Sequence, residues 1–119
     1  MVDVNAALSR SENQSVAYKI KYILDYSSHE NVTVKDIAEK LHYSVNYIIR
    51  SFKKQFGCTP AQYYIRRKNE LAKMYLRTSD YTLSEISEKL NFIDQHYFSN
   101  AFRHYTGMSP SVFRAKFRN

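Results

Sequence analysis

Two short stretches of this 119-residue sequence carry amide, imidazole and guanidinium side chains of the kinds that bind the edges of DNA bases. The first stretch contains Asn46 and Arg50, and the second contains Gln95, His96 and Asn100. Arginine can form two hydrogen bonds with guanine in the major groove, and asparagine or glutamine can do the same with adenine. Such reading requires an element that presents these side chains together on one face.

Residues that commonly build metal or catalytic sites are not spaced for that chemistry. The histidines have no cysteine partners and no H-E-x-x-H spacing, so we expect no metal site at His29, His42, His96 or His104. A glycine-rich phosphate loop, a nucleophile elbow and a cysteine–histidine pair are all lacking from the sequence. Two carboxylate pairs stand at expected helix starts, where they serve caps and the helix dipole: Asp36 with Glu39, and Glu85 with Glu88. We therefore expect neither enzyme activity nor a cofactor.

Composition limits the class of protein further. The length suits one domain, or two very small ones that share a core. The net charge is +7, and residues 32–119 hold 15 basic and 7 acidic side chains, which favours a polyanionic partner. No apolar run is long enough to cross a membrane, and no secretory signal is recognised. The single cysteine, Cys58, fits a reducing cytosol, so we expect a cytoplasmic, nucleoid-associated protein.

The two stretches belong to an internal repeat. The chain has two glycines and two prolines, and Gly57 with Pro60 stands 50 residues before Gly107 with Pro110. At the same offset Tyr47 and Phe52 match Tyr97 and Phe102, and at an offset of 49 Glu39-Lys40-Leu41 matches Glu88-Lys89-Leu90. One residue is inserted in the second copy, near Ile93. Because each copy is too small to be stable alone, a shared element should join them.

Each copy is predicted to form two helices joined by a short turn. The first helix begins with a capping box: Thr33 with Asp36, and Thr82 with Glu85. The second helix has a cap and a helix-ending glycine: Ser44 and Gly57 in copy one, Asp94 and Gly107 in copy two. It is expected to bury Ile48, Phe52 and Phe56 in copy one, and Phe98, Phe102 and Tyr105 in copy two.

The predicted fold is all-α, with two helix-turn-helix subdomains joined by a long linker helix. Residues 1–14 are polar and are expected to be a tail, a linker remnant or a short loose helix. The first subdomain is expected at 15–59 and begins with a packing helix over 15–28. Residues 60–77 contain no breaker after Pro60 and predict a basic linker helix about 27 Å long. The second subdomain is expected at 78–119.

The face opposite the core of each second helix carries the functional signal. On a helical wheel this face holds Asn46, Arg50, Lys53 and Lys54 in copy one, and His96, Asn100, Arg103 and His104 in copy two. Apart from the cap Asp94, no acid lies on either face. One basic face is common on a solvated helix, but two at equal positions of a repeat favour duplex DNA in the major groove.

Two other functions stay open. They are an all-helical module that binds an acidic protein, and a binder of single strands or RNA. Stacking on bases would need exposed aromatic rings. Most aromatic residues stand at core spacing instead: Tyr18, Tyr22, Tyr43, Tyr63, Phe92, Phe98 and Phe113.

The sequence also resembles the AraC-type transcription regulators over about residues 15–119. The most specific stretch is the continuous segment 86–103, ISEKLNFIDQHYFSNAFR, followed by Gly107-Met108-Ser109-Pro110 and Phe113-Arg114. The resemblance implies seven helices, and one monomer that reads two successive major-groove segments and regulates transcription initiation. It also implies contact with RNA polymerase. We expect a monomeric domain excised from a larger bacterial regulator that can be dimeric, with a stand-alone short regulator as the alternative.

Positional match to the family assigns roles to sixteen residues. The base readers are Asn46, Ile49, Arg50, Gln95, His96 and Asn100. The phosphate contacts are Thr33, Ser44, Tyr47, Lys53, Lys54, Arg66, Arg67, Ser99, Arg103 and Ser111. Ile49 could contact only a thymine methyl group.

The sequence departs from the family pattern at several positions. His42 and Asn91 stand where the family has a turn glycine, and because histidine adopts positive φ less often, we expect an adjusted turn in copy one. Asn100 replaces a common arginine, which favours adenine over guanine in the second block. Ser87 replaces the usual alanine and is expected to face the neighbouring helix.

Overall fold

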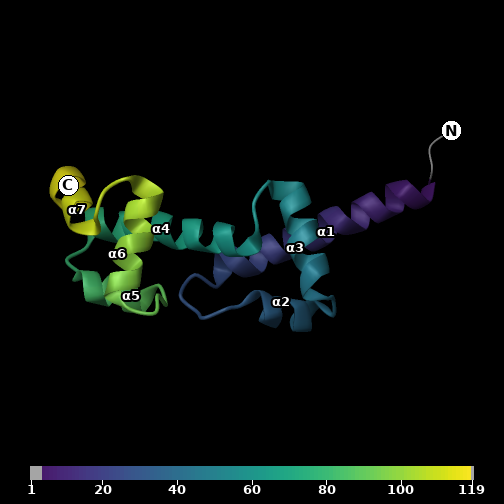
Figure 1. The fold of residues 1–119 in the computed structure, drawn as a ribbon, viewed down its shortest axis with the longest axis horizontal. Helices are drawn as coiled ribbons and strands as arrows, with labels where there is room; N and C mark the ends of the chain where they lie inside the picture. The colour runs from purple at the N-terminus through teal and green to yellow at the C-terminus, as the bar shows by residue number, and fades with distance from the viewer. Residues whose placement is uncertain (1–3, 119) are drawn as a thin grey trace. The chain divides into compact units, whose positions relative to one another are not determined.

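The computed structural model describes residues 4–118, with side chains from residue 14 onward. Within that range the fold is all-α and has seven helices (Figure 1), as predicted. Their bounds are α1 Val4–Tyr26, α2 Val34–Leu41, α3 Val45–Phe56, α4 Pro60–Thr78, α5 Leu83–Lys89, α6 Gln95–Thr106 and α7 Pro110–Phe117. The helix expected from residue 15 begins at Val4, so the polar sequence before residue 15 continues α1.

The chain divides into two compact units. The first contains residues up to Ser27 together with Val32–Tyr63, and the second contains Ser28–Asn31 together with Tyr64–Asn119. In the first unit α3 packs against α1 and α2, around buried Ile20, Ile37, Ile48 and Phe52. In the second unit α5, α6 and α7 gather around a core of Ala72, Leu76, Ile86, Leu90, Phe92, Phe98, Phe102 and Phe113.

The predicted caps form, because their signals are local. Both threonine capping boxes are complete, with Thr33 Oγ1 accepting from Asp36 N at 3.1 Å and Thr82 Oγ1 accepting from Glu85 N at 3.0 Å. Gly57 and Gly107 end α3 and α6 in the left-handed conformation, at φ 78° and 84°. Only glycine enters this region without a steric penalty from a Cβ atom.

The expected adjustment of the first turn is wrong. His42 takes φ 61° and Asn91 takes φ 55°, so both turns use the same left-handed residue despite their different side chains. The backbone makes the same hydrogen bonds in both turns: Tyr43 N donates to Ala38 O, and Phe92 N donates to Ser87 O, each at 3.0 Å. This closed turn goes with a positive φ at the residue before the donor, whichever side chain stands there.

Three of the aromatic residues expected in the core lie outside it. Tyr18 is 56% exposed and Tyr22 is 64% exposed, because the buried stripe of α1 runs through Val16, Ala17, Ile20 and Leu24 instead. Tyr105 is 37% exposed, and its hydroxyl donates to Glu70 Oε1 at 2.7 Å. A tyrosine ring can cover the edge of a core while its hydroxyl finds a polar partner, so helical spacing alone overestimated the burial.

Candidate nucleic-acid interface

Helix α3 is positioned by its cap and by its buried face. Ser44 Oγ accepts from Tyr47 N at 3.1 Å, which begins the helix at Val45. Ile48, Ser51 and Phe52 are buried against the rest of the first unit. Helical periodicity then leaves the predicted readers and anchors outward, and the exposed members of α3 are Asn46, Arg50, Lys53 and Lys54.

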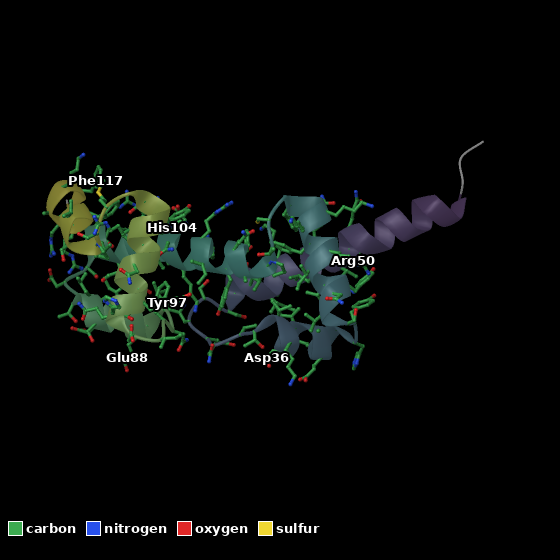
Figure 2. All side chains as sticks on the ribbon, in the orientation of Figure 1. Asp36, Arg50, Glu88, Tyr97, His104 and Phe117 are labelled. Carbon is green, nitrogen blue, oxygen red and sulfur yellow. The ribbon has the colours of Figure 1, made fainter. Side chains whose placement is uncertain are left out.

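A shallow recess lies along α3, between its buried and its exposed side. It has a volume of about 280 Å³ and is lined by Tyr47, Arg50, Ser51 and Lys54. Figure 2 shows the Arg50 side chain on this helix. The Tyr47 ring stacks on Tyr43 of the preceding turn, with centroids 4.6 Å apart and an interplanar angle of 22°. Arg50 and Lys54 thus line the same recess as a stacked aromatic ring, an arrangement suited to an anionic sugar-phosphate edge.

Helix α6 is positioned in the same way. Asp94 Oδ1 accepts from Tyr97 N at 2.7 Å, and Phe98 and Phe102 are buried. Figure 2 shows Tyr97 and His104 on this helix. The predicted base readers on α6 are all exposed; they are Gln95, His96 and Asn100. Ser99, a predicted phosphate contact, is half-buried.

Two of these readers form a pair. Asn100 Nδ2 lies 3.2 Å from His96 Nε2, one helical turn away. When Nδ2 donates to a neutral imidazole, the amide keeps one N–H and its carbonyl oxygen for a base, which is the pattern that adenine requires. The pair restricts the rotation of the Asn100 amide before any ligand binds.

Two acidic side chains, Asp36 and Glu70, are held by hydrogen bonds. The Asp36 carboxylate accepts from the backbone and side chain of Thr33, and these hydrogen bonds lower the pKa of Asp36. Glu70 accepts from Tyr105, which lowers the pKa of Glu70, and from Lys73 Nζ at 3.0 Å. Neither residue stands on α3 or α6, and within these two helices no Asp or Glu occurs, since Asp94 is the cap that precedes α6.

The remaining predicted phosphate contacts are also at the surface. Thr33, Arg66, Arg67, Arg103 and Ser111 are exposed. Thr33 and Ser44 use their hydroxyl oxygens as helix caps. The groups that remain for binding an anion at the starts of α2 and α3 are therefore backbone N–H groups. Ser111 is the second residue of α7, whose N-cap is Ser109.

Two residues to which the sequence pattern gave no role hold these elements in place. Lys68 is only 4% exposed, and its Nζ donates to Asn91 O at 3.2 Å in the turn before α6. The Arg114 guanidinium donates from Nε to Leu76 O at 3.1 Å and from Nη2 to Ser79 O at 3.3 Å, which closes the end of α4. Lys68 stands in a basic run, and only its spacing of four and eight residues from Ala72 and Leu76 indicated a buried position.

Other kinds of site receive no support from the described part of the chain. Between residues 4 and 118, no three His, Cys, Asp or Glu side chains are grouped so that they could hold a metal ion. No described helix is both long and apolar enough to span a membrane. Cys58 is buried.

Comparison with known proteins decides the family. Residues 37–116 match the family described as a helix-turn-helix domain. The arabinose operon regulatory protein of Escherichia coli is 28% identical over 115 residues, which are 97% of this chain and 39% of that protein. The chain belongs to the AraC-type helix-turn-helix family. It is a DNA-binding domain of the transcription-regulator class, and this family is one of regulators, not of enzymes.

Solved structures of the AraC-type family share the fold. The C-terminal domain of AraT, a response regulator from Geobacillus stearothermophilus, has a TM-score of 0.82 and 28% identity, and the match covers 87% of each chain. The DNA-binding domain of AdpA, solved in complex with a target DNA, has a TM-score of 0.78 and 27% identity, over 86% of this chain and 91% of that one.

Curated relatives are longer than this AraC-type domain. The Msm operon regulatory protein of Streptococcus mutans is 30% identical over 111 residues, or 93% of this chain. The chain spans 40% of that protein and 15% of an uncharacterised regulator of Bacillus subtilis that is 27% identical.

Proposed function

We propose that this AraC-type domain reads two successive major-groove segments of one duplex and regulates transcription initiation from that site. The observation that carries the proposal is the repetition of one arrangement. In each unit a capped helix buries two large apolar side chains and turns amide and basic groups outward. The relative AdpA was solved with its DNA, which supports a duplex as the ligand.

The base readers are divided between the two units. Asn46, Ile49 and Arg50 on α3 contact the first block, and Arg50 binds guanine. Gln95, His96 and Asn100 on α6 contact the second block, where Asn100 binds adenine. Phosphates are contacted by Thr33, Ser44, Tyr47, Lys53, Lys54, Arg66, Arg67, Ser99, Arg103 and Ser111.

The cellular setting follows from the same function. A domain that regulates initiation works beside RNA polymerase at a promoter, in the cytoplasm. We infer that the isolated domain acts as a monomer, because a repeat within one chain supplies two reading helices without a second copy.

Selection from a random duplex pool tests the proposal. We expect an asymmetric site with two blocks about 10 bp apart, since that is one helical turn. Anisotropy titrations of the selected duplex at several salt concentrations should give a slope of roughly six to ten released counterions. One enriched block would mean that a single unit reads DNA. No enrichment and a flat salt response would overturn the proposal and favour a module that binds an acidic protein.

A further inference from the structure

Lys68 on α4 is a buried cation that the proposed reading faces do not use. Its side chain is 4% exposed, and burial lowers its pKa to about 8. Its Nζ donates to Asn91 O at 3.2 Å and lies 4.4 Å from the ring centroid of Tyr64 and 5.4 Å from that of Phe92. A carbonyl oxygen and two ring faces therefore surround the ammonium group.

This position is energetically unusual. A buried ammonium group loses its hydration, and an apolar side chain of similar size would fill the same space without that penalty. Lys68 donates to the carbonyl of Asn91, the left-handed residue of the turn, in a hydrogen bond that is partly buried. Removing the ammonium group takes away the side-chain donor that ties this turn to α4.

The contacts of Lys68 continue into the reading helix. Asn91 and Phe92 stand in the turn that leads to the start of α6 at Gln95. The Phe92 ring is 5.1 Å from that of Phe98 and 6.2 Å from that of Tyr97, both on α6. Lys68 thus holds two successive turn residues, one by its carbonyl and one by its ring, and the second of these packs on α6.

We propose that Lys68 is a positioning residue for α6, which sets the orientation in which the second unit presents its readers to DNA. The inference rests on the proposed function. A matched position in the first unit supports it. Among the side chains described for α1, positions 16, 17, 20 and 24 are buried, and from residue 68 onward α4 repeats this spacing at 68, 69, 72 and 76, so Lys68 corresponds in spacing to Val16. A valine side chain has no hydrogen-bond donor, so the contact from the supporting helix to the turn carbonyl is specific to the second unit.

A cross between protein variants and DNA variants tests the proposal. Lys68→Met removes the ammonium group and keeps a long flexible side chain. Lys68→Arg keeps a cation and its donors, and Lys40→Met removes an exposed lysine outside the predicted site as a charge-matched control. Each protein is titrated against the selected duplex and against duplexes in which either block is scrambled, and its melting temperature is measured.

We expect Lys68→Met to bind the selected duplex at least about tenfold more weakly, with selectivity lost at the second block and kept at the first. Its melting temperature should change by less than about 5 °C, because the lost hydrogen bond and the removed buried charge oppose each other. Lys68→Arg should restore the second-block selectivity, and Lys40→Met should leave both blocks unchanged.

A folded Lys68→Met protein with normal selectivity at both blocks would overturn the inference, as would an equal loss at both. If that variant does not fold, Lys68→Gln provides the same comparison, because its shorter amide does not reach the turn and should also lose only the second block. If the wild-type domain selects no two-block site, the proposed function is wrong and the inference about Lys68 fails with it.

Discussion

The two units present their proposed reading helices, α3 and α6, on differently supported turns. In the first unit the supporting helix α1 buries Val16 and Ala17, and in the second the matching positions of α4 are Lys68 and Asn69. The first turn stacks Tyr43 on Tyr47, whereas the matching rings of the second, Phe92 and Tyr97, are tilted and 6.2 Å apart, and the Lys68 ammonium group donates to that turn. One backbone arrangement can therefore be held by apolar packing or by a buried polar group.

The reading faces differ in chemistry as well. The outward face of α3 holds three formal positive charges, and that of α6 holds Arg103 with amide and imidazole groups. Charge–phosphate contacts supply salt-dependent affinity that does not depend on sequence, whereas amide contacts with base edges supply selectivity. We expect the first unit to contribute more of the salt dependence and the second unit more of the adenine preference.

The largest expected effect is a pH dependence of stability that comes from the buried Lys68. Lys68 has a pKa of about 8 in the folded state and about 10.5 in the unfolded chain, so the unfolded chain binds more protons between these values. The stability of wild type relative to Lys68→Met should therefore rise with pH from about 8 to 10.5, by up to about 3 kcal/mol. Urea unfolding of both proteins across this pH range measures the difference between their free energies of unfolding. If that difference stays constant with pH, the pKa of Lys68 is not lowered by burial.

The next effect separates readers from anchors on α3. Arg50→Ala should lose about 1–3 kcal/mol of binding at one base pair of the first block and discriminate less there. Lys53→Ala, its matched control one turn along the helix, should weaken binding to all sequences alike and reduce the salt slope by about one counterion. Titrations of selected and scrambled duplexes check both, and equal losses on the two duplexes for Arg50→Ala would remove its role as a reader.

Asn69 offers a change in the opposite direction. Its side chain is fully buried, and its amide nitrogen and oxygen have no hydrogen-bond partner among the described residues, whereas the matching Ala17 has no polar side-chain atom. Asn69→Leu should raise the free energy of unfolding by about 1–2 kcal/mol, because it removes an unsatisfied amide from the core. Denaturant unfolding measures this gain. A variant with a lower free energy of unfolding than wild type would show that the Asn69 amide stabilises the fold and is not an unsatisfied group.

The smallest effect concerns the two turns. His42→Gly should stabilise the first unit by about 0.5–1 kcal/mol, since it relieves a side chain at φ 61°. Asn91→Gly should gain less, because asparagine tolerates this conformation better. Thermal unfolding of the two variants gives the ranking, and the reverse order would mean that the side chains, not the backbone, decide the turn energies.

Local signals predicted most of the fold. The capping boxes at Thr33 and Thr82 and the glycine ends at positions 57 and 107 depend on neighbouring residues, and all of them form. The exposure of Tyr18 and the burial of Lys68 depend on which face of a helix meets the rest of its unit, and charge or helical spacing alone did not reveal them. The base-reading and phosphate roles stay predictions, because they depend on a duplex.

Crossed dissociation constants test most directly whether α3 and α6 each read their own block of one duplex. Arg50→Ala and Asn100→Ala are titrated against the selected duplex and against duplexes with the first or the second block scrambled. We predict that Arg50→Ala loses affinity only while the first block is intact, and that Asn100→Ala does so only while the second is intact. If both variants lose affinity equally on every duplex, the two helices do not read separate blocks and the account is wrong.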